Sequence, residues 1–176
     1  MNLVRPTLVL LALTAACGAE KKPVETPSAV TSTTNDASAS NERQPVGNNL
    51  TVTGEIYRLC QLRAQSAIEA APKFTFDTSA ITKNDAVVLD QVARCLTTGP
   101  LAHRRVALTG RADPRGTEEY NMTLGAKRAD AVASYLERGS VPSTNLDQTS
   151  RGALDATGSG DATWAKDRRV DIALAP

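Results

Sequence analysis

The stretch RVALTGRADPRGTEEYNMTLGAKRADAVASYLER, residues 105–138, decides the fold. Its first residues place Val106 and Leu108 on one side of an extended chain, as in a strand that is half-buried against a core. After a charged loop, apolar residues recur at helical spacing from about Glu118 to Arg138, and Gly139 ends the pattern. The stretch therefore predicts a strand, a polar loop and a long helix in succession.

The segments on either side complete an α+β pattern. Residues 72–77 alternate as a strand does, and Thr82 can cap a helix from about Asn84 to Thr97. Residues 146–150 and 168–174 are predicted as two further strands, separated by a Gly-rich polar loop. The order β-α-β-α-β-β predicts a sandwich in which helices pack on one mixed sheet.

The N-terminus has the features of an export signal over residues 1–16. Arg5 precedes a short apolar run that ends in small residues and Cys17. This arrangement resembles the bacterial lipobox, which implies that Cys17 carries lipid and becomes the first residue of the mature chain. The alternative is an ordinary secretory signal cleaved near Ala16. By the sorting rule of enteric bacteria, Gly18 after the cysteine favours the periplasmic face of the outer membrane.

A tether and an extension are predicted between the anchor and the folded domain. Residues 17–50 are rich in Ser, Thr, Pro, Asn and Ala, and such a composition cannot bury enough apolar surface to offset the entropy of ordering. We expect a disordered tether there and an N-terminal extension over 51–71. Within the extension, residues 52–60 suit a short edge strand or a helix. The main domain is predicted over 72–176.

Composition argues against several classes of function. The chain of 176 residues has 20 Lys and Arg against 19 Asp and Glu, and only 3% aromatic residues. It therefore lacks both the field that collects phosphate backbones and the rings that stack on bases, so nucleic acid is not an expected partner. With one histidine, His103, and no cysteine pattern typical of metal ligands, we expect neither a metal nor a cofactor. No nucleophile elbow or phosphate loop indicates an enzyme.

Four separated blocks resemble the OmpA-like C-terminal domain family, the group that includes peptidoglycan-associated lipoproteins. The blocks are residues 74–77, 110–121, 124–129 and 167–172, and the resemblance extends from Pro72 to the end of the chain. It implies an OmpA-like fold that binds peptidoglycan without a covalent bond, through the diaminopimelate residue of the stem peptide.

The resemblance also implies the residues of the site. A loop aspartate and a helix arginine carry the contact, and they correspond here to Asp113 and Arg128. The side-chain end of diaminopimelate bears an ammonium and a carboxylate on one carbon, so an acid and a guanidinium a few ångströms apart suit it. The alternative is that the two form an ordinary salt bridge with each other. Asp77, Asn121 and Arg169 are possible supporting residues, although Asn121 and Arg169 also suit capping the loop and pairing with a buried carboxylate.

The chain departs from the family pattern at three places near these blocks. It has Arg111-Ala112 where His-Thr is usual, Leu124-Gly125 where Leu-Ser is usual, and Asp167 where Asn is usual. The departures keep the charged pair and change the residues around it.

Cys60 and Cys95 are the two thiols left if Cys17 is lipidated. In an oxidising compartment we expect them to form a disulfide between the extension and the domain. The alternative is two small buried core residues. Taken together, the sequence predicts a wall-binding lipoprotein and not an enzyme. The alternative function is a partner-binding component of a periplasmic complex, of the Tol or secretion type, with little wall binding.

Overall fold

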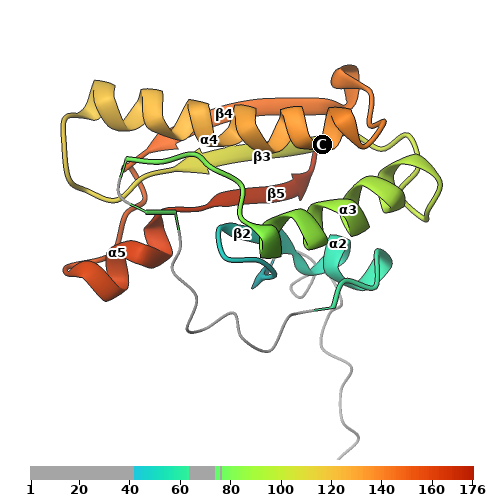
Figure 1. Cartoon of the computed structure of the whole chain (residues 1–176), viewed down its shortest axis with the longest axis horizontal. Helices are drawn as coiled ribbons and strands as arrows, with labels where there is room; N and C mark the ends of the chain where they lie inside the picture. The colour runs from blue at the N-terminus through green and yellow to red at the C-terminus, as the bar shows by residue number, and fades with distance from the viewer. Residues whose placement is uncertain (1–41, 64–73, 76) are drawn as a thin grey trace, which may run out of the picture. The chain divides into compact units, whose positions relative to one another are not determined.

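The computed structural model describes residues 42–63, 74–75 and 77–176. They form a mixed five-stranded sheet with the strand order β1-β2-β5-β3-β4 (Figure 1). Strand β2 is parallel to β5, β3 is parallel to β4, and the β1–β2 and β3–β5 pairs are antiparallel. The predicted α+β class with one mixed sheet is confirmed. The strands are β1 (Arg43–Pro45), β2 (Leu50–Thr53), β3 (Val106–Arg111), β4 (Leu146–Gly152) and β5 (Val170–Leu174).

Two long helices carry most of the helical core, and their ends follow from capping chemistry. Helix α3 starts after Thr82, whose hydroxyl accepts from the backbone N–H of Asp85 while the Asp85 carboxylate accepts from the N–H of Thr82. Helix α4 starts after Thr117, whose hydroxyl accepts from the N–H of Tyr120. Both long helices were predicted, and the bounds of α4 agree with the prediction. The helices are α2 (Gly54–Leu59), α3 (Lys83–Thr97), α4 (Glu118–Arg138), α5 (Asp161–Asp167) and a 3-10 turn, η1 (Ser143–Asn145).

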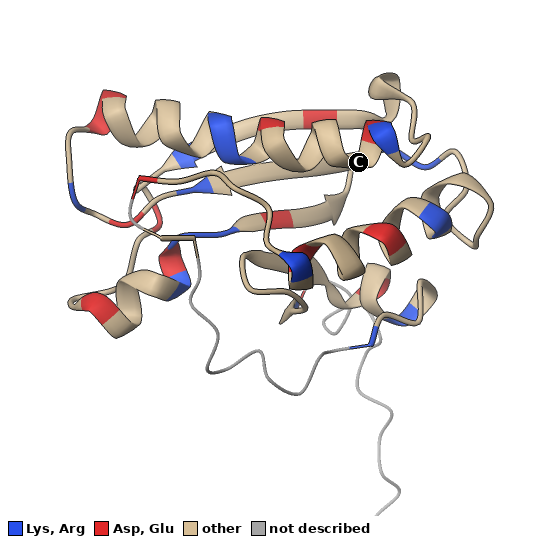
Figure 2. Ribbon diagram, viewed as in Figure 1, with Lys and Arg blue, Asp and Glu red and all other residues tan. Residues whose placement is uncertain are grey.

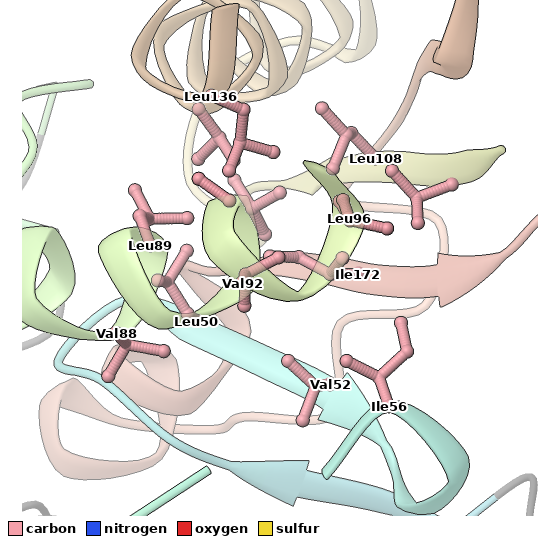
Figure 3. Packing of buried hydrophobic residues seen from close by; sticks show 14 of the residues in the cluster. Leu50, Val52, Ile56, Val88, Leu89, Val92, Leu96, Leu108, Leu136 and Ile172 are labelled. Atoms are coloured by element: carbon pink, nitrogen blue, oxygen red, sulfur yellow. The ribbon is translucent and has the colours of Figure 1, made fainter. Parts of the chain in front are cut away.

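The core lies where α3 and α4 meet the sheet. Side chains of α3 pack against Leu136 of α4 and against apolar residues of β2, β3 and β5 (Figure 3). The predicted inward residues Val106 and Leu108 are fully buried. Val87 was also expected among the apolar positions of α3, but its side chain is 45% exposed, because it lies on the outer face of the helix.

Helix α4 lies unusually close to β3. A Cβ atom on Gly110 would come within 1.8 Å of the carbonyl oxygen of Gly125, and a Cβ on Gly125 would come within 2.3 Å of the Ser150 hydroxyl oxygen. The glycine found where Leu-Ser is usual therefore has a steric reason in this chain: Ser150 of β4 fills the space that a side chain at position 125 would need.

The predicted strand over residues 72–77 is wrong for its described members. Phe74, Thr75 and Asp77 lie in a bend, an irregular segment and a turn. The place beside β5 is taken by β2, in which residues 50–52 pair with residues 170–172. Phe74 is still buried, but against the side chain of Arg128 and not through a sheet position.

Order begins earlier than the sequence predicted. Residues 42–49, assigned to the tether, run into the sheet through β1, and Asn49 donates from its backbone and its side chain to the Asp85 carboxylate at 2.9 and 2.6 Å. Residues 52–60 contain a strand end and a helix in turn, and β2 is an inner strand and not an edge. Cys17, the signal segment and the rest of the predicted tether lie outside the described residues. Within the described part, no helix is both long and apolar enough to cross a membrane.

A disulfide joins α2 to α3. The sulfurs of Cys60 and Cys95 are 2.02 Å apart and the Cα atoms 5.4 Å apart, as expected for a disulfide. The predicted pairing is confirmed. Helix α5 was not predicted, because its seven residues lie within a segment that Gly and polar residues mark as a loop.

Candidate binding site

Asp113 lies in the loop between β3 and α4, where acidic and basic residues of this loop, α5 and the start of β5 come together (Figure 2). Its side chain is 4% exposed. Oδ1 accepts from the backbone N and Nε of Arg115 at 3.2 and 3.1 Å, and Oδ2 accepts from Nη2 of Arg115 at 2.8 Å and Nη1 of Arg168 at 2.9 Å. Burial raises the pKa of Asp113, but the hydrogen bonds from the two arginines outweigh it, so the pKa lies below its usual range. The carboxylate is therefore ionised at neutral pH.

Arg128 projects from α4 and is fully buried. Its Nε donates to the carbonyl of Thr78 at 2.9 Å and its Nη1 to the carbonyl of Arg111 at 2.8 Å, while the guanidinium lies 4.8 Å from the ring centre of Phe74. Its Nη2 is buried and has no hydrogen-bond partner among the described residues. Burial and the nearby cation Arg168 lower the pKa of Arg128 to about 10, so the side chain is still a cation at neutral pH.

Asp113 and Arg128 are neighbours without being bonded to each other. The ion pairs of Asp113 within the described residues go to Arg115 and Arg168, which answers the alternative that the acid and Arg128 neutralise one another. Asp113 is nevertheless close enough to raise the pKa of Arg128 through its charge, as is Asp77. The site therefore contains an ionised acid, and beside it a buried cation whose hydrogen-bonding capacity is not filled.

A pocket of about 230 Å³ lies along the first turns of α4 beside Asp77, and Asp113 and Arg128 are not among its lining residues. Asp77 lies on its wall and accepts a hydrogen bond from the hydroxyl of Tyr120. That hydrogen bond is the main cause that raises the pKa of Tyr120, and the charge of Arg128 acts on the same phenol in the opposite direction. The pocket thus lies within the electrostatic reach of the buried pair. It is lined by Asp77, Glu119, Tyr120, Thr123, Leu124 and Lys127.

The other two supporting residues take structural positions. Asn121 is 3% exposed in the first turns of α4, and its side-chain oxygen would lie 3.8 Å from a Cβ on Gly116. Arg169 donates from Nε to the buried carboxylate of Asp171 at 2.8 Å and from Nη1 to the carbonyl of Lys166 at 3.0 Å. Of the predicted set, the structure brings together Asp113, Arg128 and Asp77, whereas Arg169 belongs to a second charged cluster.

The sequence did not identify the arginines that hold Asp113. Arg115 is only two residues away and was available as a signal, whereas Arg168 comes from 55 residues further along the chain. Arg115 also stacks on Trp164 of α5, with its guanidinium carbon 4.6 Å from the ring centre. This contact gives the tryptophan a place at the rim of the site.

The departures from the family pattern build the surroundings of the pair. The Arg111 side chain pairs with Asp171 and Asp155, which fixes the strand end whose carbonyl holds Arg128. The carboxylate of Asp167 accepts from the backbone N–H groups of Thr157 and Gly158 at 3.2 and 3.0 Å and so orders the loop before α5. Arg111 thus acts on the site through Arg128, and Asp167 through α5.

These observations define a class of protein: an α+β domain with an ionised aspartate and a buried arginine where a strand meets a long helix. The sequence model of the OmpA family matches residues 73–170, which is more than half of the chain. The chain belongs to the OmpA family.

Several relatives and a solved structure are similar to this chain. The peptidoglycan-associated lipoprotein of Pseudomonas putida is 37% identical over 115 residues, 63% of this chain and 68% of the relative. That of Haemophilus influenzae is 38% identical over 102 residues, 57% of this chain and 65% of the relative. The crystal structure of the peptidoglycan-associated lipoprotein from Burkholderia pseudomallei is 35% identical with a TM-score of 0.54, over 58% of this chain and 86% of that one.

Proposed function

We propose that this chain is an outer-membrane lipoprotein that faces the periplasm, is anchored through Cys17, and binds peptidoglycan non-covalently through Asp113 and Arg128. The names of its relatives support association with peptidoglycan and a lipid anchor. In this account the head domain holds the wall, the N-terminal lipid holds the membrane, and the chain between them links the two layers.

The Nη2 of Arg128, which has no partner in the part of the chain that the structure describes, is the observation that carries the proposal. A buried donor without an acceptor costs about 1–3 kcal/mol, and native proteins keep few of them. A carboxylate fills such a position well, because it accepts from a guanidinium through two oxygens and carries the opposite charge. The site therefore has the chemistry for a carboxylate ligand at Arg128.

Asp113 supplies the second half of the recognition. An ammonium next to the bound carboxylate would find an ionised acceptor there, whose pKa is held below its usual range by Arg115 and Arg168. A ligand that carries both charges on one carbon satisfies both residues at once, and the side-chain end of diaminopimelate is such a group. The pocket lined by Asp77 and Tyr120 offers room for the adjoining part of the stem peptide.

Sedimentation of the full chain with purified peptidoglycan tests the site. We expect wild-type protein to sediment with the wall, and Asp113→Ala and Arg128→Ala each to lose most of the bound fraction. Arg105→Ala is the matched control, because it removes one charge at the distant start of β3, where Arg105 pairs with Asp147. Sedimentation of both site variants at the wild-type level would contradict the assignment of Asp113 and Arg128. Failure of the wild type to sediment would favour a partner-binding role instead.

Membrane fractionation tests the anchor separately. We expect Cys17→Ser to move the protein from the membrane fraction to the periplasmic fraction, because the cysteine sulfur is the attachment point for the lipid. Retention of Cys17→Ser in the membrane fraction would contradict the lipid anchor and leave the wall-binding site untouched.

A further inference from the structure

The oxygens of Asp113 are already occupied in the free protein. Oδ1 accepts two hydrogen bonds from Arg115, and Oδ2 accepts one from Arg115 and one from Arg168. Two oxygens of a carboxylate offer about four acceptor positions, so an arriving ammonium finds no vacant one. Any cationic ligand at Asp113 must therefore displace a guanidinium of the protein itself.

Arg115 is the guanidinium that can leave. Its side chain is 34% exposed, whereas Arg168 is 12% exposed and also donates to the backbone carbonyl of Phe74. The backbone N–H of Arg115 remains bonded to Oδ1 of Asp113 wherever the side chain goes. Release of the Arg115 side chain therefore leaves the loop in place, whereas release of Arg168 would break a contact that holds Phe74.

A second position for the Arg115 guanidinium lies directly beside the first. Its Nη1 is 3.8 Å from Oδ1 of Asp161, and its guanidinium carbon is 4.6 Å from the ring centre of Trp164. The fork thus has one side on Asp113 and the other towards α5. A small rotation transfers the cation from the Asp113 carboxylate to the Asp161 carboxylate while it stays on the aromatic face that it already contacts, and both groups bind arginine favourably.

We infer that Arg115 is a displaceable latch on Asp113: it occupies the position of the ligand's ammonium in the free protein and, while it stays stacked on Trp164, turns from Asp113 to Asp161 when an amino-acid ligand binds. This inference rests on the proposed function of the site. The latch keeps the buried acid paired when the site is empty, and it makes entry selective for cations that compete with a guanidinium.

Calorimetric titration of the full chain with free diaminopimelate tests the latch. Arg115→Met removes the internal competitor while retaining the length of the side chain, so we expect it to bind about two- to fivefold more tightly than wild type. Arg115→Lys keeps a cation at Asp113 and should return the affinity towards the wild-type value. Arg105→Met, which removes an equally positive residue that is 56% exposed and remote from the site, should bind like wild type.

Fluorescence of Trp164 gives an independent reading, because it is the only tryptophan of the chain. Saturating ligand should change the emission of the wild type, because the guanidinium that lies over the ring leaves Asp113 and turns towards Asp161, and should leave the emission of Arg115→Met unchanged. Tight binding by the wild type without a change in emission would overturn the movement.

The outcomes separate the latch from the function on which it rests. If the wild type binds and Arg115→Met binds equally or less tightly, the latch is wrong and the site stands. If Arg115→Met binds and the wild type does not, both the latch and the site are supported. If neither binds free diaminopimelate nor sediments with peptidoglycan, the proposed function fails and the latch fails with it.

Discussion

Asp113 and Asp171 are two buried aspartates with similar surroundings, but they differ in how fully the neighbouring arginine is hydrogen-bonded. Their side chains are 4% and 3% exposed, and arginines hold the pKa of each below its usual range despite burial. Asp171 accepts from Nε of Arg111 at 2.5 Å and from Nε of Arg169 at 2.8 Å, and the hydroxyl of Thr51 donates to it as well. Asp113 accepts from Arg115 and Arg168.

The two clusters differ in the hydrogen bonds made by one neighbouring guanidinium, that of Arg111 or that of Arg128. Arg111, in the Asp171 cluster, is shared with a second carboxylate, Asp155. Within the described residues, the hydrogen bonds of Arg128, beside Asp113, go to backbone carbonyls, and one of its nitrogens has no acceptor. A buried charge cluster in which every donor is hydrogen-bonded stabilises the fold, whereas a cluster with one unbonded donor can bind a ligand. The comparison separates a structural cluster from a binding cluster built of the same residue types.

Replacement of the aspartate should lower the free energy of unfolding most in the Asp171 cluster. Asp171→Ala leaves the buried Arg111 without one of its carboxylates, and breaking such a pair costs about 3–5 kcal/mol of unfolding free energy. Asp113→Ala should cost less, about 1–3 kcal/mol, because Arg115 can turn to solvent and Asp161. Urea unfolding of both variants measures the difference. Equal losses would remove the distinction between the clusters.

Loss of the cation should sharpen the contrast. Arg111→Met is expected to lower the unfolding free energy by about 3 kcal/mol, because Asp171 loses a partner in the interior. Arg128→Met should change it by no more than about 1 kcal/mol, because it removes a buried charge with an unfilled donor together with two neutral acceptor contacts. The same variant should lose peptidoglycan binding. A loss of stability in Arg128→Met as large as that in Arg111→Met would show that Arg128 is a structural residue.

Acid should destabilise the fold through both aspartates. Because the folded pKa of each lies below the unfolded value of about 4, their contribution to stability is complete above pH 4 and is lost as the pH falls through the folded pKa values. The unfolding free energy should therefore be level from pH 7 to about pH 5 and fall below pH 4. Asp171→Asn should flatten this fall more than Asp113→Asn does. Unfolding curves at several pH values check the order.

The smallest effect is expected at the edge of the Asp171 cluster. Arg151, near the end of β4, and Asp155, in the turn that follows, are 49% and 38% exposed, so solvent screens the pair. Arg151→Gln should leave both unfolding and peptidoglycan binding at wild-type values. A marked loss in either would show that the cluster extends further than the buried groups.

Local pattern predicted much of the fold because several elements carry their own signals. The Thr82 cap, the long apolar stripe ended by Gly139, and the alternation around Val106 and Leu108 depend on residues close in sequence. Residues 72–77 were wrongly predicted as a strand, because the alternation indicates that Phe74 is buried but not which part of the chain covers it. The pairing of β2 with β5 joins segments about 120 residues apart, and no local pattern reports that choice.

The sequence predicted which residues form the site but not which hydrogen bonds they make. The acid and the arginine followed from the family resemblance, yet their immediate partners depend on the tertiary fold. Arg168 reaches Asp113 across 55 residues, and the carbonyls that hold Arg128 belong to Thr78 and Arg111. The sequence also could not show that Arg115 occupies the acceptor positions of Asp113 in the free protein, since this depends on the conformation of one side chain.

A comparison of two ligands tests the paired recognition most directly. Nα-acetyl-lysine amide carries the side-chain ammonium of diaminopimelate but has no free carboxylate, so it can use Asp113 and not Arg128. Calorimetric titration should show wild-type protein binding diaminopimelate at least about tenfold more tightly than Nα-acetyl-lysine amide, the value of one charge-assisted contact. Arg128→Met should bind the two ligands equally. Equal affinity of the wild type for diaminopimelate and Nα-acetyl-lysine amide would contradict the role of Arg128.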